Sequence, residues 1–226
     1  MKSPVWSASV MCANLGRLEE DIQALEASGC HELHFDIMDG QFVPNIALGF
    51  DFIKMARSVS KLPCDAHLMV EAPERWIDRC VEAGCRSISI HLEACTHVHR
   101  ALSRIREAGT VPGIAINPAT PLTKLQYLLP SVERILVMTV DPGYAGQKLL
   151  PAAFERVKIL KENLAYNESR TVIQVDGNID AQNAGRMWRY GAGNFVLGTA
   201  GLFTGGDLRA SMARFLAEFQ VESVLA

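Results

Sequence analysis

Side chains that bind metal ions stand at the ends of three apolar runs of this chain. His34 and Asp36 lie two residues apart in the first run. His67 lies in the second run, and Asp176 closes the third. Alternate residues of a β-strand point to the same face, so His34 and Asp36 can face one ion. We therefore predict a metal site with two histidine and two aspartate ligands.

Two imidazoles and two carboxylates form a ligand set of intermediate softness. Such a set suits one divalent Zn, Fe, Mn or Co ion better than Ca or Mg, and it does not select among these four. His91, followed by Glu93, ends another apolar run and is a candidate either for a place behind the ligands or for an ordinary core position. We expect the side chains of His31, His97 and His99 to lie at the surface.

Eight strand-plus-helix units would bring the ligands together. Gly29, Gly84, Gly109 and Gly191 stand where a helix would end in a left-handed residue before the next strand. The predicted strands lie near residues 5–10, 31–36, 64–69, 86–91, 111–116, 134–139, 171–176 and 194–198. Their spacing of roughly 27 residues suits βα units. We predict an α/β fold, a (β/α)8 TIM barrel that forms a single domain over residues 1–226, with its chemistry at the C-terminal strand ends.

Apolar stripes and prolines predict where the helices lie. Two stripes have the helical period: Leu15, Leu18, Ile22 and Leu25, and Phe154, Val157, Leu160 and Leu164. Pro73 after Ala72 and Pro121 after Thr120 are typical of the first helical position, so we predict that helices begin there.

The two aspartates are suited to acid and base chemistry at one carbon atom. Asp36 and Asp176 belong to the second and seventh predicted strands, which are three positions apart around a ring of eight. They can therefore flank a molecule on the barrel axis, where one removes a proton from one face and the other returns a proton to the opposite face. A metal ion bound to the carbonyl and an adjacent hydroxyl would stabilise the enediolate between these steps.

Three methionines fall at or beside the ends of predicted strands. Met38, Met69 and Met138 are either filler of the core or a polarizable, non-basic cover over an enediolate. A thioether neither donates nor removes a proton, so the second role would protect the intermediate.

Glycine-rich loops follow the last three predicted strands, at residues 141–147, at Gly177 and at Gly198-Thr199. Glycines let backbone N–H groups approach an anion, and (β/α)8 barrels frequently bind phosphate after strands seven and eight. We predict a phosphate site there, with loop 141–147 as a candidate lid.

The composition argues against large charged partners. The net charge is −3 and the pI is about 6.1, which disfavours a nucleic-acid partner and leaves a small anionic substrate open. We find no signal-peptide stretch and no apolar run near the roughly 18 residues of a membrane span. We expect a soluble, cytoplasmic protein without a membrane partner.

The six cysteines are predicted to be reduced thiols without a role: Cys12, Cys30, Cys64, Cys80, Cys85 and Cys95.

Several motifs carry a resemblance to a known family. They are Ser9, HFDIMDG at 34–40, FVPN at 42–45, HLMV at 67–70, NPATP at 117–121, VM at 137–138, PGYAGQ at 142–147 and VDG at 175–177. In this order they resemble the ribulose-phosphate 3-epimerase family over nearly the whole chain.

The resemblance implies a barrel of the ribulose-phosphate binding type and a ketose phosphate as substrate. It implies His34, Asp36, His67 and Asp176 as metal ligands, with the two aspartates also as the acid/base pair. Ser9 and the three methionines would line the substrate site. The residues implied to hold phosphate are Gly143, Ala145, Gly146, Gly177, Gly198 and Thr199, with Asn178 beside them. Family members commonly form dimers or hexamers, which implies a homo-oligomer.

Departures from the usual motifs bear on the sugar. Ribulose-5-phosphate enzymes usually have a second glycine at the position of Asn178. They usually have Gly-Phe-Gly-Gly where this chain has Gly-Tyr-Ala-Gly at 143–146, and Gly-Ser-Ala where it has Gly-Thr-Ala at 198–200. Two segments look more like the allulose-6-phosphate 3-epimerase branch in their sequence: residues 139–142 with Ala145, and residues 198–203. The expected reaction inverts C3 of D-ribulose 5-phosphate to give D-xylulose 5-phosphate, or of D-allulose 6-phosphate to give D-fructose 6-phosphate.

Two other functions compete with this interpretation. Ketose-phosphate decarboxylases and aldolases of related barrels carry an Asp-x-Lys-x-x-Asp signature on the third strand, and this chain has His67 in place of the lysine. A non-catalytic sugar-phosphate binding protein with a structural metal would not need two carboxylates facing each other across the barrel.

Overall fold

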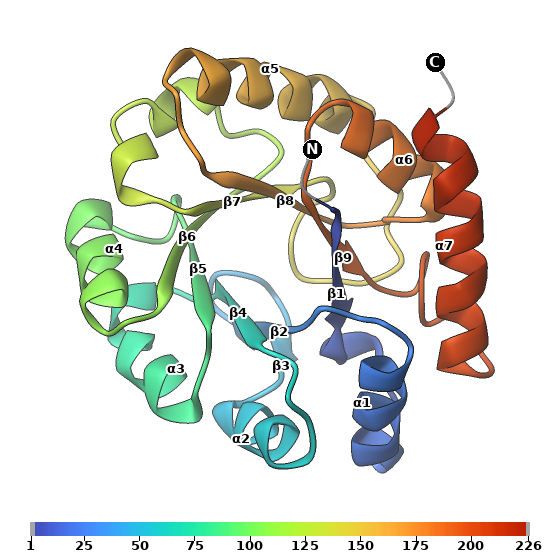
Figure 1. Ribbon diagram of the computed structural model, residues 1–226. Coiled ribbons are helices and arrows are strands. Elements are labelled where there is room, and N and C mark those ends of the chain that lie inside the picture. Colours follow the sequence, from blue (N-terminus) through green and yellow to red (C-terminus); the bar gives the residue numbers. More distant parts are fainter. Residues whose placement is uncertain (1–2, 225–226) are drawn as a thin grey trace.

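A closed ring of parallel β-strands wrapped by α-helices forms the computed structural model, which describes residues 3–224 (Figure 1). The strands are β1 (Val5–Ser9), β2 (Glu32–Asp39), β3 (Ile46–Ala47), β4 (Cys64–Met69), β5 (Ser87–His91), β6 (Val111–Ile116), β7 (Arg134–Met138), β8 (Val172–Asp176) and β9 (Asn194–Leu197). The α-helices are α1 (Leu18–Ala27), α2 (Phe50–Val59), α3 (Ile77–Ala83), α4 (Val98–Glu107), α5 (Ala152–Tyr166), α6 (Ala181–Arg189) and α7 (Leu208–Val224). Single 3-10 turns are η1 (Val10–Cys12), η2 (Leu15–Arg17), η3 (Pro73–Arg75), η4 (Leu122–Leu125) and η5 (Leu129–Ser131).

The first strand closes the ring, because β1 pairs in parallel with both β2 and β9. The order around the ring is β1-β9-β8-β7-β6-β5-β4-β2. The predicted (β/α)8 TIM barrel is therefore confirmed. The ring strands lie where they were predicted, except that β2 runs on to Asp39. The short β3 was not predicted, and it pairs antiparallel with the end of β2.

Alternation along β2 separates an apolar outer face from an inner face that carries its polar site residues. On β2, Phe35 and Ile37 belong to the large apolar core between the strands and the helices. His34 and Asp36 point into the ring and are almost completely buried. The helices thus cover the apolar face, and the chemistry-bearing side chains are left for the interior.

A buried ion-pair network fills the base of the barrel. Arg134 on β7 donates two hydrogen bonds to Glu32, at 3.2 and 3.1 Å, and lies 2.8 Å from the carboxylate of Asp65. Both carboxylates are more than nine-tenths buried. A charge buried this deeply needs its partner, so Arg134 holds β2, β4 and β7 in one arrangement.

Of the two predicted helix starts, the one at Pro73 is confirmed as the first residue of a 3-10 helix that α3 follows, and the one at Pro121 is wrong. Pro73 opens the 3-10 turn η3, and Pro121 precedes the 3-10 turn η4. Three prolines between residues 117 and 131 remove N–H groups that an α-helix between β6 and β7 would need.

The two predicted apolar stripes differ in outcome. Leu15 lies in η2 and is 54% exposed, whereas Leu18, Ile22 and Leu25 of the same stripe are buried. The stripe that begins at Phe154 is buried on α5 as predicted.

Within residues 3–224 no helix combines the length and the apolar character that a membrane crossing requires. The single domain over 1–226, the cytoplasmic location and the homo-oligomer stay predictions.

Candidate active site

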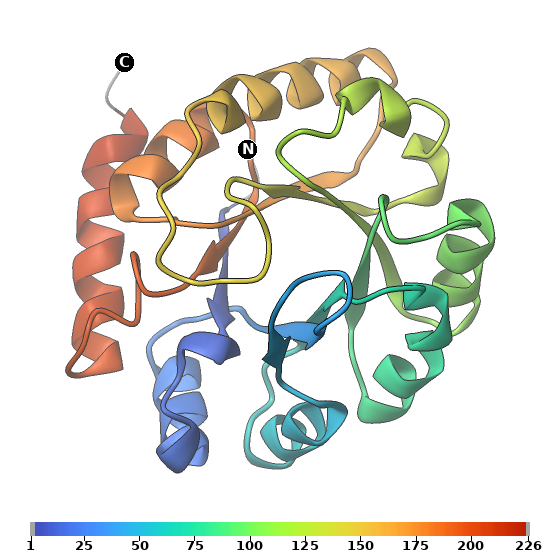
Figure 2. The ribbon, with the colours of Figure 1, turned by 180° about the vertical axis from the view of Figure 1, so that it is seen from behind.

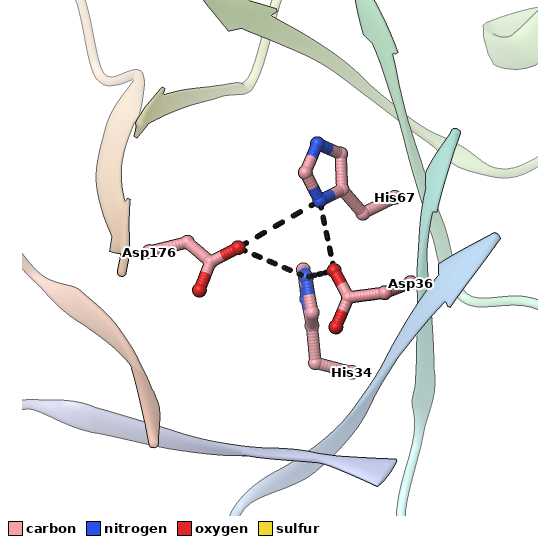
Figure 3. A group of neighbouring side chains, drawn as sticks. All are labelled: His34, Asp36, His67 and Asp176. Carbon is pink, nitrogen blue, oxygen red and sulfur yellow. Dashed lines mark hydrogen bonds and ion pairs between the residues drawn. The ribbon is translucent and has the colours of Figure 1, made fainter. Parts of the chain in front are cut away.

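Four side chains from three strands converge at the C-terminal end of the ring (Figure 3). His34 and Asp36 come from β2, His67 from β4 and Asp176 from the end of β8. One ligand atom of each lies within 4.8 Å of those of the other three. The convergence predicted for these four residues is therefore present.

Strand register places the four side chains. Asp36 lies directly beside His67 in the pairing of β2 with β4, and alternation brings His34 to the same inner face as Asp36. Asp176 comes from β8, which is three positions from β2 around the ring. The carboxylates thus approach the histidine pair from two sides.

The spacing and the donor types fit a divalent ion. His34 Nε2 lies 3.3 Å from Asp36 Oδ1 and 4.0 Å from Asp176 Oδ2, and His67 Nδ1 lies 3.1 and 3.8 Å from the same two atoms. Tetrahedral ligands about 2.1 Å from one ion are about 3.4 Å apart. His34 Nε2 is buried and has no hydrogen-bond partner among residues 3–224. A buried nitrogen that is aimed into the cluster without a hydrogen-bond partner is suited to bind a metal ion.

The two carboxylates differ in their affinity for a proton. Burial raises the pKa of Asp176 to about 6, and the negative charge of Asp36 acts in the same direction. Burial acts on Asp36 as well, but His34 outweighs it and holds the pKa of Asp36 well below its usual range. One carboxylate is thus kept charged while the other accepts a proton near neutral pH, as an acid/base pair requires.

Each histidine of the cluster is held from behind. Asp65 Oδ2 lies 2.8 Å from His34 Nδ1, and Asp65 also accepts a hydrogen bond from Ser87 at 2.6 Å. His67 Nε2 lies 2.9 Å from Nε2 of His91. Of the two positions that the sequence left open for His91, the structure shows the one behind the four-residue cluster. The contact of Asp65 with His34 was not predicted, although the place of Asp65 two residues before His67 puts it on the same inner face.

A pocket opens above the cluster. Its floor includes Asp36 and Asp176, whereas both imidazoles are completely buried beneath. The predicted substrate-binding residues line it: Ser9, Met38, Met69, Met138, Gly143, Ala145, Gly146, Gly177, Asn178, Gly198 and Thr199. The glycine loops after β7, β8 and β9 therefore reach one cavity.

Several residues of the pocket were not predicted, and Met11 and Cys12 are two of them. Met11 and Cys12 line it because the chain leaves β1 at Ser9 and turns over the mouth as η1. All six cysteines are free thiols, as predicted, but Cys12 lies in the site. Burial raises the pKa of Cys12 to about 11, so the thiol stays neutral. Ser9 donates a hydrogen bond of 2.9 Å to Asp36 Oδ2 and so orients that carboxylate.

Loops from opposite sides of the ring meet over the mouth. The segment between β2 and β3 and the long loop after β7 both extend across the opening (Figure 2). Asn45 Nδ2 donates to the carbonyl of Gly143 at 2.8 Å, and the Tyr144 hydroxyl donates to the carbonyl of Pro44 at 2.6 Å. The loop predicted as a lid is thus tied across the pocket.

Known proteins match this chain over most of its length. The profile of the "Ribulose-phosphate 3 epimerase family" matches residues 5–203. The chain belongs to the ribulose-phosphate 3-epimerase family. It is 39% identical to the ribulose-phosphate 3-epimerase of Aquifex aeolicus over 202 residues, which cover 89% of this chain and 90% of that protein. It is 36% identical to the chloroplastic ribulose-5-phosphate-3-epimerase of Arabidopsis thaliana over 86% of this chain and 70% of that protein.

Membership of the ribulose-phosphate 3-epimerase family makes this chain an epimerase, an enzyme of the isomerase class. The barrel itself is shared more widely. A mutant tryptophan synthase alpha-subunit from Pyrococcus furiosus superposes with a TM-score of 0.69 over the whole of both chains, at 13% sequence identity. At that identity the likeness concerns the fold alone.

Proposed function

We propose that this epimerase inverts C3 of a phosphorylated ketose with Asp36 and Asp176 as its acid/base pair and with a divalent metal ion. The observation that carries the proposal is the approach of two carboxylates with opposite pKa shifts to one pocket floor. A carbon between them can lose a proton to one side and gain one from the other.

In one direction, the charged carboxylate takes the C3 proton of the ketose and leaves an enediolate. The other carboxylic acid then delivers its proton to the opposite face of C3, which inverts the centre. In the reverse direction the two residues exchange roles. Ser9 keeps Asp36 oriented through its hydrogen bond to Oδ2. Positioned acid/base groups typically contribute about 10²–10⁴-fold each.

His34, Asp36, His67 and Asp176 would hold the metal ion. When bound, a Zn, Fe, Mn or Co ion would act as a Lewis acid that stabilises negative charge on the oxygens of the substrate. The orphaned Nε2 of His34 supports such a site.

The rest of the pocket would bind and shield the substrate. Backbone N–H groups of the glycine loops after β7, β8 and β9 would hold the phosphate. Met38, Met69 and Met138 line the cavity beside the aspartates and offer no competing acid or base. The tied loops would limit the entry of water.

Two sugars fit the proposal. The names of the relatives favour D-ribulose 5-phosphate, which would give D-xylulose 5-phosphate. The motifs at 139–142 with Ala145 and at 198–203 favour D-allulose 6-phosphate, which would give D-fructose 6-phosphate. Asn178 lines the pocket, where its side chain would shift how the longer sugar sits.

The competing functions have less support. A decarboxylase or aldolase needs its cationic lysine, and His67 occupies that position. Asp65, the first acid of that signature, lies below the pocket and is engaged with Arg134 and His34. A binding protein would have no use for carboxylates with opposite pKa shifts.

Metal removal tests the proposal. Protein stripped with a chelator would be inactive on both sugar phosphates, and adding back Zn, Mn, Fe or Co one at a time would restore inversion. Equal activity before and after complete metal removal would contradict the proposal, and the ratio of the two kcat/KM values would identify the preferred sugar.

A further inference from the structure

A chain of hydrogen-bonding groups leads from His67 away from the pocket. His67 Nε2 lies 2.9 Å from His91 Nε2, and His91 Nδ1 lies 3.2 Å from Glu93 Oε2. His91 is completely buried, packs 4.7 Å from the ring of Phe42, and does not line the pocket. It therefore touches no substrate in this fold, and whatever it does must act through its neighbours.

The orientation of His67 fixes where the protons lie. Figure 3 shows one ring nitrogen of His67 facing the two aspartates and the other pointing away. For Nδ1 to offer a lone pair to an ion, Nε2 must carry the hydrogen and donate it to His91 Nε2. His91 then carries its own hydrogen on Nδ1, which it donates to Glu93. A hydrogen on Nε2 of His67 thus requires His91 to accept there, and His91 can accept there only while its own hydrogen is on Nδ1, facing Glu93.

Glu93 is itself anchored by the turn that follows β6. Its carboxylate accepts hydrogen bonds from the backbone N–H of Asn117, at 2.9 Å, and from the hydroxyl of Thr120. Arg156 on α5 donates to the carbonyls of Thr120 and Asn117, at 2.8 and 3.2 Å. The NPATP motif at 117–121 lines no part of the pocket, and these contacts show that it holds Glu93 in place.

We propose that His91 and Glu93 are positioning residues, which fix the tautomer and the ring orientation of His67 for metal binding. The inference rests on the proposed metal site and adds two residues and the NPATP turn to it. His34 has a shorter support, since Asp65 contacts it directly. His67 instead contacts the neutral imidazole of His91, which lies between His67 and the carboxylate of Glu93. Outer partners of metal-binding histidines typically change metal affinity by about 10–100-fold when removed.

The test compares variants of β5 on the full-length protein. His91→Phe keeps a ring and removes both hydrogen bonds, His91→Gln keeps one acceptor and one donor, and Glu93→Gln removes the charge. Ser89→Ala is the matched control: Ser89 pairs with His67 across β4 and β5, is fully buried, and its hydroxyl has no hydrogen-bond partner in the described part of the chain. Affinity for Zn and Co is measured by competition with a chelator, together with the Co absorption spectrum and the Tm of the metal-free protein.

We expect His91→Phe to weaken Zn and Co binding about 10–100-fold and to shift the Co spectrum, and Glu93→Gln to weaken binding about 3–10-fold. His91→Gln should recover most of the affinity, and Ser89→Ala should bind as the unmodified protein does. If His91→Phe does not fold, Glu93→Gln decides, because its carboxylate lies at the edge of the barrel. Unchanged affinity and spectrum in a folded His91→Phe or, failing that, in Glu93→Gln would overturn the inference. An unmodified protein that binds neither metal would instead refute the proposed function.

Discussion

Asp36 and Asp176 reach the same nitrogen of His67 from two sides, at 3.1 and 3.8 Å, although they are 140 residues apart in the chain and their strands are three positions apart around the ring. Under the proposed function this relationship would tie metal binding to proton transfer, because the carboxylates that would face the substrate would also border the ion. The two carboxylates differ in pKa because burial and the charge of Asp36 raise the pKa of Asp176, while His34 keeps the pKa of Asp36 low.

Replacing either aspartate by asparagine should stop the reaction. Asp36→Asn and Asp176→Asn each remove one of the two proton-transfer groups, so we expect turnover to fall by about 10²–10⁴-fold. An amide oxygen remains to contact an ion. Turnover is measured on both sugar phosphates, and the metal content of each variant is determined alongside. Either variant with turnover near that of the unmodified protein, and with metal bound, would contradict the assignment.

Loosening the tie across the mouth should weaken substrate binding. Asn45→Ala and Tyr144→Phe each remove one hydrogen bond between the two loops. A hydrogen bond of this kind is worth about 0.5–1.5 kcal/mol, so each change should raise KM by about 2–10-fold with little effect on kcat. Tyr166→Phe serves as the control, because Tyr166 is 90% exposed on α5. Steady-state kinetics that show an unchanged KM in both variants would mean that the tie does not hold the substrate.

Asn178 should affect both stability and the choice of sugar. Its φ is +53°, a left-handed conformation that asparagine tolerates and that glycine adopts without strain. Asn178→Ala should therefore lower the free energy of unfolding by about 1 kcal/mol, and Asn178→Gly should leave it nearly unchanged. If the side chain favours the longer sugar, Asn178→Gly should raise kcat/KM for D-ribulose 5-phosphate relative to D-allulose 6-phosphate. An unchanged ratio would remove Asn178 from the account of specificity.

Glu93 should stabilise the metal-free protein in a pH-dependent way. Burial raises its pKa, but the hydrogen bonds from His91, Thr120 and Asn117 outweigh burial and lower it to about 2. In the unfolded chain a glutamate has a pKa of about 4.3. A depressed pKa gives stability that is present above the unfolded value and is lost as the pH falls toward the folded value.

Urea unfolding of the metal-free protein tests this. Glu93→Gln should be less stable than the unmodified protein at pH 7, and the difference should shrink as the pH is lowered from about 5 toward 2. A difference that stays constant over this range would show that the carboxylate charge does not contribute.

Local sequence patterns were sufficient for the barrel and for the convergence of His34, Asp36, His67 and Asp176. The two-residue spacing of His34 and Asp36 on an apolar run determines that they share the inner face, whatever the rest of the chain does. The same alternation along the next apolar run places the side chain of His67 on the inner face. Because strand ends of a parallel barrel meet at one rim, the glycine loops could be assigned to one pocket without knowledge of their contacts.

Contacts between distant segments could not be predicted in this way. The tie between Asn45 and Gly143 joins residues 98 positions apart and depends on how two loops fold over the mouth. The contact of His91 with His67 depends on ring orientation as well as on register. Cys12 enters the pocket because the chain turns sharply after β1, and no periodic pattern marks such a turn.

Proton NMR in D2O tests the central claim most directly. The metal-loaded protein is incubated with D-ribulose 5-phosphate and, separately, with D-allulose 6-phosphate, and the C3 proton is followed. Proton transfer through Asp36 and Asp176 predicts that the C3 signal of at least one sugar disappears while the inverted epimer, deuterated at C3, accumulates. A C3 proton that is retained in both sugars with every one of the four metals would contradict the account, and so would inversion without deuterium.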